Sequence, residues 1–194
     1  MRVPPFCGRV EAVMGTMVSI RVVPGDLGRT ELDGILNAAV EELHRIDAAF
    51  STYRSESLLS RVRRSELGFS QAGSEMDEVV EACQAALTAS HGYFDPWRMP
   101  GGFDPTGFVK GWALGRALAL LASSGAPAAL IGAGGDFAAF GAPDPSGAWR
   151  VGLRDPKDAK EVLATLAVPA PGGLATSGTY ERGAHLIDPF RGRP

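Results

Sequence analysis

The segment from Gly101 to Gly141 constrains the fold more than any other part of this 194-residue chain. Its pattern predicts a helix from about Phe108 to Ser124 and a short buried strand from Ala128 to Gly132. The strand runs into Gly132-Ala133-Gly134-Gly135-Asp136, which at first sight fits a dinucleotide-binding loop. Such a loop needs a helix directly after the glycines, whereas the apolar residues that follow read as another strand. A Rossmann fold, and with it an NAD-dependent oxidoreductase, is therefore disfavoured.

Two further amphipathic helices are predicted in the first half of the chain. Apolar residues recur at helical spacing from Leu32 to Phe50, and Thr30 with Asp33 forms a candidate cap. A second helix opens at Ser74 and stops near Gly92, with Val79, Val80, Cys83 and Leu87 on its apolar side. We expect both apolar stripes to be buried.

Strand patterns dominate the rest of the chain. Residues 10–23, 149–153 and 162–168 are predicted strands, and residues 173–194 alternate short strand candidates with Gly and Pro turns. Helices come early, short strands cluster late, and one βα unit lies between them. This order predicts an α+β fold with a mixed, mostly antiparallel sheet and packed helices. Without a linker or repeat, residues 1–194 are expected to form a single domain.

Charge and cysteine content exclude several classes of protein. A net charge of −3 gives no electrostatic reason to expect nucleic acid as a partner. The only short basic cluster, Arg61, Arg63 and Arg64, reads as a solvated helix end. Cys7 and Cys83 lie far apart without CxxC spacing, so no disulfide framework is expected.

The N-terminal residues predict a cytoplasmic protein. Residues 1–15 contain two prolines and no continuous apolar segment, so neither a signal peptide nor a lipoprotein anchor is expected. No stretch approaches the roughly 20 apolar residues that a membrane span needs.

Polar residues at the entry to the helix near Phe108 suit an anionic ligand. Lys110 can neutralise phosphate charge, and backbone N–H groups at a helix start can bind phosphate oxygens. The alternative is an ordinary pair, in which Asp104 caps the helix and Lys110 is exposed. The residues alone leave both interpretations open.

Five ordered blocks resemble one known family. Residues 103–117, FDPTGFVKGWALGRA, followed by residues 132–141, GAGGDFAAFG, resemble the core of the FAD:protein FMN transferases, the ApbE family. The other blocks are residues 14–16, residues 50–54, and residues 175–182 running into 185–189. The blocks span nearly the whole chain and are highly specific together. The resemblance implies an ApbE-like, T-fold-related single domain.

The resemblance also implies an activity. Relatives transfer FMN from FAD to a Thr or Ser hydroxyl of a target flavoprotein, release AMP and depend on Mg²⁺. Water in place of the hydroxyl would give an FAD pyrophosphatase that forms FMN and AMP. The residues whose counterparts bind the flavin nucleotide are Met14, Tyr53, Asp104, Lys110, Gly134, Gly135 and Asp136.

Further residues are assigned to the chemistry and the metal by the same resemblance. Lys110 is expected to clamp phosphate during the reaction, and the backbone carbonyl of Gly107 to help bind Mg²⁺. His185 is expected to donate to phosphate or relay a proton, whereas His44 and His91 lie on predicted helices and are assigned structural roles.

The C-terminal part departs from the family pattern. Relatives continue beyond this point into a segment whose Asp-x-x-x-Thr motif supplies two metal ligands. In addition, Arg191 stands where Thr is usual in the segment from Asp188 to Gly192. We therefore expect weakened metal binding, and an FAD-binding protein with little or no turnover is the alternative to an active transferase.

Overall fold

The computed structural model describes residues 6–143, 147–158, 160–178, 183 and 188–192. The chain divides into two compact units. The first comprises Met1–His44 and Gly111–Ser177, and the second comprises Arg45–Lys110 and Gly178–Pro194. Helices α1 (Arg29–Phe50) and α4 (Thr106–Ser123) each contribute residues to both units. Within the part of the chain that the structure describes, no helix is long and apolar enough to cross a membrane.

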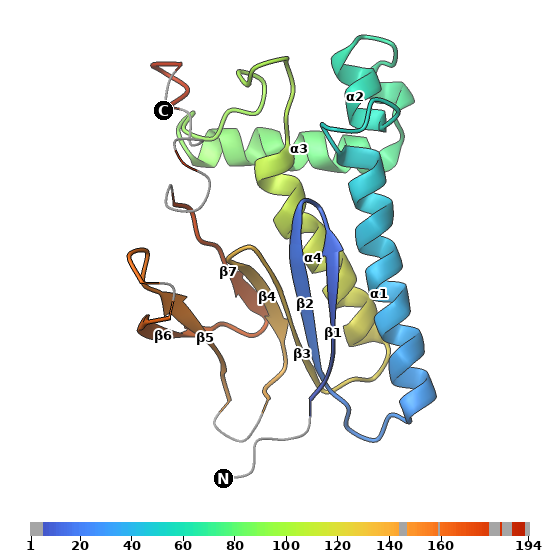
Figure 1. Ribbon diagram of the computed structural model, residues 1–194. Coiled ribbons are helices and arrows are strands. Elements are labelled where there is room, and N and C mark those ends of the chain that lie inside the picture. The colour runs from blue at the N-terminus through green and yellow to red at the C-terminus, as the bar shows by residue number, and fades with distance from the viewer. Residues whose placement is uncertain (1–5, 144–146, 159, 179–182, 184–187, 193–194) are drawn as a thin grey trace. The chain divides into compact units, whose positions relative to one another are not determined.

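The first unit is built on a five-stranded sheet in the order β1-β2-β3-β4-β7, with every neighbouring pair antiparallel (Figure 1). Its strands are β1 (Cys7–Val13), β2 (Thr16–Val23), β3 (Ala128–Ala133), β4 (Asp136–Phe140) and β7 (Gly172–Leu174). A separate antiparallel pair joins β5 (Trp149–Arg154) to β6 (Val162–Val168). The combination of helices and antiparallel sheet confirms the predicted α+β class.

Polar contacts attach the helices of the first unit to each other and to the sheet. Arg116 Nε of α4 donates to Glu42 Oε1 of α1 at 2.8 Å. His44 Nε2 of α1 lies 3.1 Å from Glu11 Oε1 of β1. The predicted apolar stripe of α1 is buried from Leu32 to Phe50, except that Ile35 is half-buried.

Strand β3 is buried along its whole length, because both of its faces are covered. On one face, Ala128 and Leu130 belong to an apolar cluster that includes Trp149 of β5 and Val168 of β6. Ile131 lies on the opposite face, beside Ile20 of β2 in the register, and both side chains are fully buried. A strand covered on two sides reads as a continuous apolar run, which explains the sequence pattern at 128–133.

The second unit is mainly helical. It holds α2 (Leu58–Arg63), the 3₁₀ helix η1 (Phe69–Gln71) and α3 (Ser74–Ala89), together with the end of α1 and the start of α4. Arg45 of α1 donates two hydrogen bonds to the Glu75 carboxylate of α3, at 2.7 and 2.6 Å. In the predicted apolar stripe of α3, Val79 and Cys83 are buried, whereas Val80 and Leu87 are only half-buried.

Two details of the secondary-structure prediction were wrong. The single strand predicted for 10–23 is a hairpin, in which β1 and β2 are joined by a two-residue turn at Met14 and Gly15. The predicted cap at Thr30 lies inside α1, and Glu31 Oε2 instead accepts a hydrogen bond from Gly28 N at 2.8 Å. Neither Met14-Gly15 nor a glycine before the helix is a strong local signal.

Candidate functional site

Two hairpin turns lie at the same end of the five-stranded sheet. Met14 and Gly15 connect β1 to β2, and Gly134 and Gly135 connect β3 to β4. Val18 of β2 pairs with Ala133 of β3, just before the second turn. The register therefore brings Met14, Gly134, Gly135 and Asp136 to one end of the sheet, as neighbouring site residues should be.

Both turns have left-handed backbone at both central positions. The φ angles are 56° at Met14 and 68° at Gly15, and 57° at Gly134 and 97° at Gly135. Positive φ at both positions matches the right-handed twist of the flanking strands. A methionine in this region is uncommon, and such residues cluster where function constrains the backbone. Met14 is therefore a stronger site candidate than its sequence alone suggests.

The segment after β7 closes over the Gly134-Gly135 turn. Asp136 Oδ1 accepts a hydrogen bond from Thr176 N at 3.3 Å. A Cβ added at Gly135 would lie only 3.2 Å from Thr176 Cβ, so the close approach depends on glycine. Thr176 thus lies beside the glycine turn, although the two are far apart in sequence.

In the second unit, Asp104 fixes the start of α4. Its Oδ1 accepts a hydrogen bond from Thr106 N at 3.0 Å, and its own N–H donates to Pro96 O at 2.8 Å. Asp104 therefore caps the helix, because it accepts a hydrogen bond from one of the N–H groups that have no partner within the helix.

Lys110 lies one helical turn after Thr106, so the two residues share a face of α4. The side chain is half-buried rather than exposed, unlike an ordinary surface lysine. Gly107, the second residue of the helix, is exposed. Thr106, Gly107 and Lys110 thus place a hydroxyl, an accessible backbone and an ammonium group at one helix start, where anions are favoured.

Sequence analysis missed Arg63. The side chain, at the last residue of α2, was assigned to a solvated helix end, but it is only 17% exposed, as is that of Asp104. Arg63 Nη1 lies 3.2 Å from Asp104 Oδ2, and Nη2 donates to Pro100 O at 2.7 Å. The one available signal was Pro100-Gly101-Gly102, whose glycines leave room for a large side chain.

Tyr53 lies in the bend after α1 and is 97% exposed. It therefore does not seal the end of α1, as a packed aromatic side chain at a helix end would. Its backbone N–H donates to Ser51 Oγ at 3.2 Å, so the backbone is held while the ring extends into solvent. An exposed tyrosine ring on a fixed backbone can stack on an aromatic ligand.

His185 lies outside the described residues. Residues 188–192 form a tight turn, in which Asp188 Oδ1 accepts hydrogen bonds from Phe190 N at 2.8 Å and Arg191 N at 3.2 Å. Arg191 Nε lies 3.5 Å from Asp188 Oδ2. The guanidinium that replaces the usual threonine is therefore paired with the aspartate of its own turn.

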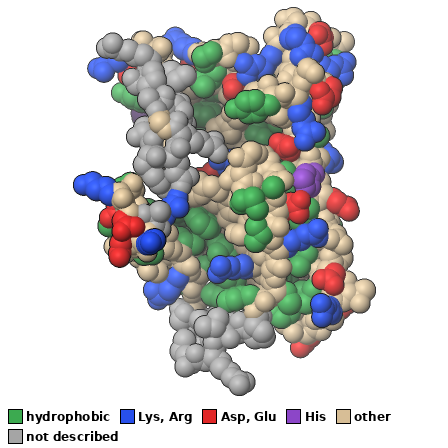
Figure 2. All heavy atoms as spheres, in the orientation of Figure 1, with side chains coloured by type: hydrophobic (Ala, Val, Ile, Leu, Met, Phe, Trp, Pro, Cys, Tyr) green, Lys and Arg blue, Asp and Glu red, His purple; other side chains and the backbone are tan. Residues whose placement is uncertain are grey.

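Among the described residues, neither the buried cysteine nor the acidic side chains form a competing reaction centre. Burial raises the pKa of the Cys83 thiol to about 11, so the thiol stays protonated at neutral pH and is a poor nucleophile. Within the described ranges, no group of three or more His, Cys, Asp or Glu side chains is placed to hold a metal ion. The face seen in Figure 2 mixes basic with acidic side chains and shows no extended basic patch.

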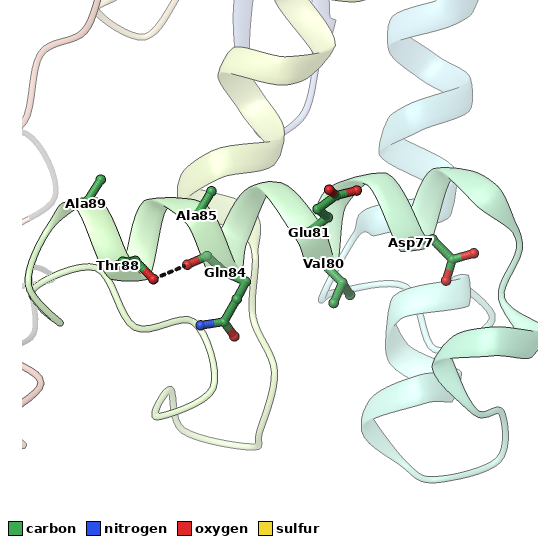
Figure 3. Close-up of a pocket in the computed structure, with 7 residues that line it drawn as sticks. All are labelled: Asp77, Val80, Glu81, Gln84, Ala85, Thr88 and Ala89. Carbon is green, nitrogen blue, oxygen red and sulfur yellow. Dashed lines mark hydrogen bonds between the residues drawn. The ribbon is translucent and has the colours of Figure 1, made fainter.

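A hollow on α3 is lined by none of the candidate site residues named above. The residues that line it all come from this one helix (Figure 3): Asp77, Val80, Glu81, Gln84, Ala85, Thr88 and Ala89. Its ionisable groups, Asp77 and Glu81, are acids, which would repel a phosphate. This hollow is therefore not the anion site that the sequence predicts.

Comparisons with known proteins agree with the five sequence blocks. The model of the ApbE family matches residues 14–101 and 98–194. The chain matches no curated protein sequence.

Solved structures share the fold. The crystal structure of the ApbE protein from Thermotoga maritima matches with a TM-score of 0.83 and 22% identity, over 98% of this chain and 78% of the relative. The flavinyl transferase ApbE from Pseudomonas stutzeri, in its apo form, gives a TM-score of 0.76 and 22% identity, over 98% and 75%. The flavin transferase ApbE from Vibrio cholerae gives 0.73 and 20%, over 98% and 79%.

Proposed function

Since the chain belongs to the ApbE family, we propose that it transfers FMN from FAD to a Thr or Ser hydroxyl of a target flavoprotein and releases AMP. The observation that carries this proposal is the extent of the family match, which includes every residue assigned to the site. The solved relatives from Pseudomonas stutzeri and Vibrio cholerae, both described as flavin transferases, support it. We further propose that residues 1–194 act as a single transferase domain.

The reaction is a phosphoryl transfer. The acceptor hydroxyl oxygen attacks the pyrophosphate phosphorus on the FMN side, and a new P–O ester bond forms. The bond from that phosphorus to the bridging oxygen breaks, and AMP leaves with the oxygen. The hydroxyl proton passes to a base, for which we propose His185. Catalysis then depends mainly on positioning and on charge neutralisation.

The start of α4 is proposed to bind the pyrophosphate. Lys110 supplies a positive charge, and the N–H groups near Gly107 supply donors along the helix axis. Asp104 holds this end of the helix in place through its hydrogen bond to Thr106 N. In transfer, Lys110 would also stabilise the charge that develops on the leaving AMP.

The sheet end is proposed to contribute to flavin binding. Gly134 and Gly135 keep backbone free of side chains at this turn, and Asp136 anchors the Thr176 segment beside it. Met14 and Tyr53 offer an apolar side chain and an exposed ring that suit an isoalloxazine.

Magnesium is proposed from the family resemblance, with the Gly107 carbonyl as one ligand. When bound, the ion would neutralise pyrophosphate charge and polarise its oxygens. The described donors do not form a metal cluster by themselves, and Mg²⁺ commonly keeps water and takes substrate phosphates as ligands.

The test uses FAD, Mg²⁺ and an acceptor protein of the Vibrio cholerae flavin transferase. AMP is measured by chromatography, and covalent flavin by fluorescence of the denatured acceptor in a gel. We expect AMP and labelled acceptor in equal amounts, and loss of both in His185→Ala without loss of FAD binding. AMP without label would indicate FAD hydrolysis, and FAD binding without AMP would indicate a flavin-binding protein. Either result contradicts the proposed transfer.

A further inference from the structure

Arg63 holds an unusual position for a residue at a helix end. Its Nη1 atom is buried and, in the part of the chain that the structure describes, makes no hydrogen bond of good geometry. The contact with Asp104 Oδ2 at 3.2 Å is therefore an ion pair rather than a two-pronged hydrogen-bonded pair. The geometry indicates that charge, more than hydrogen bonding, joins the two side chains.

The loop before α4 is shaped around this guanidinium. Gly101 has a φ of 81°, and a Cβ added there would lie 2.4 Å from Arg63 Nη2. Arg63 Nη2 also donates to the neighbouring Pro100 O at 2.7 Å. The arginine thus crosses from α2 to the loop at a point where a side chain in place of Gly101 would displace the guanidinium.

Asp104 poses an electrostatic problem at a phosphate site. A carboxylate is favourable at a helix start as long as the site is empty. Once a pyrophosphate binds at the same helix start, the carboxylate repels it. Both side chains are only 17% exposed, so water and salt screen this repulsion weakly.

We propose that Arg63 is a positioning residue for FAD binding, which neutralises Asp104 so that the start of α4 accepts a pyrophosphate. The proposal rests on the proposed function, because it takes FAD as the ligand of α4. Asp104 can then cap the helix without opposing a ligand at the helix N–H groups. Arg63 acts through Asp104 and need not contact FAD.

A double-mutant cycle tests this role. FAD affinity is measured by flavin fluorescence for the wild-type chain, Arg63→Met, Asp104→Asn and the double variant, with riboflavin as the uncharged probe. Arg63→Met should weaken FAD binding by about tenfold, because one charge is left uncompensated near the pyrophosphate. In the Asp104→Asn background, the same change should weaken it by less than about twofold. Riboflavin affinity should change by less than about twofold in all variants.

Two further variants separate this role from folding. Arg63→Lys keeps the charge and should keep the ratio of FAD to riboflavin affinity. Arg64→Met is the matched control, because Arg64 also contacts a carboxylate, Glu66 at 2.7 Å, and a carbonyl, Ser55 O at 2.8 Å, but not Asp104. If Arg63→Met fails to fold, Arg63→Lys decides: an unchanged ratio of FAD to riboflavin affinity supports the charge role, and a selective loss of FAD affinity contradicts it.

Equal losses of FAD affinity in the two Asp104 backgrounds would overturn the inference, as would equal losses of FAD and riboflavin affinity. A wild-type chain that binds no FAD would instead overturn the proposed function. The two failures are therefore distinguished by the wild-type titration.

Discussion

At the sheet end of the first unit, the proposed site residues are held by backbone conformation, whereas at the start of α4 in the second unit they are held by charge. Each hairpin turn has positive φ angles at its two central residues. At the second turn, the missing side chain of Gly135 allows Thr176 to approach closely. The α4 start depends on Asp104, its ion pair with Arg63 and the half-buried Lys110. Substitutions in the first region should therefore act mainly on stability, and those in the second mainly on affinity for anions.

The largest effect on stability is expected at Gly135. Gly135→Ala combines a left-handed backbone with a contact to Thr176 and should lower the free energy of unfolding by about 2–3 kcal/mol. Gly15→Ala is the matched control, because its φ is 68° but a Cβ there meets nothing within 4 Å. It should lower the same quantity by about 1 kcal/mol. Urea denaturation measures both, and equal losses would show that the Thr176 approach is not tight.

Lys110→Ala should lower FAD affinity and leave stability nearly unchanged, whereas Gly135→Ala acts mainly on stability. FAD affinity should fall by about tenfold, because a charge-assisted contact to pyrophosphate is lost, while riboflavin affinity stays unchanged. The free energy of unfolding should change by less than about 0.5 kcal/mol. Lys157→Ala, at an exposed lysine in the first unit, is the control and should leave FAD affinity unchanged. A parallel loss of FAD and riboflavin affinity would remove Lys110 from the phosphate site.

Asp136 tests how the sheet end beside the Gly134-Gly135 turn is stabilised. Asp136→Ala removes the acceptor for Thr176 N and should lower the free energy of unfolding by about 1 kcal/mol. Asp136→Asn keeps an acceptor oxygen and should lower it by less than about 0.5 kcal/mol. Chemical denaturation gives both values. Equal losses in the two variants would mean that the charge of Asp136, rather than the hydrogen bond, matters here.

The smallest effect on stability is expected at Tyr53. Because the ring is 97% exposed, Tyr53→Leu should change the free energy of unfolding by less than about 0.5 kcal/mol. FAD affinity should fall by about threefold if the ring stacks on the flavin, and Tyr53→Phe should retain it. Flavin fluorescence titration measures these affinities. Unchanged FAD affinity in Tyr53→Leu would exclude the ring from the site.

The sequence predicted those elements whose pattern is local. The stripe from Leu32 to Phe50 repeats at helical spacing, and the burial of α1 follows it closely. The buried strand predicted for 128–132 and the strand predicted after Gly135 correspond to β3 and β4, because a two-sided buried strand and a glycine turn each leave a local signature. The family resemblance pointed to Met14 as a site residue, but its pattern did not reveal the hairpin turn.

Features that depend on distant partners could not be predicted. Arg63 and Arg64 are neighbours in one basic cluster, yet Arg63 is paired with Asp104 of a distant loop while Arg64 pairs with nearby Glu66. Local charge patterns do not distinguish these two outcomes. Likewise, only strand register shows that the turns at 14–15 and 134–135 lie at the same end of the sheet.

Amide hydrogen exchange with and without FAD tests the central claim most directly, because it reports on both regions in the unmodified protein. We predict that saturating FAD slows exchange in peptides covering residues 134–136 and in peptides covering residues 106–110, whereas riboflavin protects the second group much less. The exposed hollow on α3 should be unaffected. Protection confined to one of the two regions, or found mainly along α3, would contradict the account.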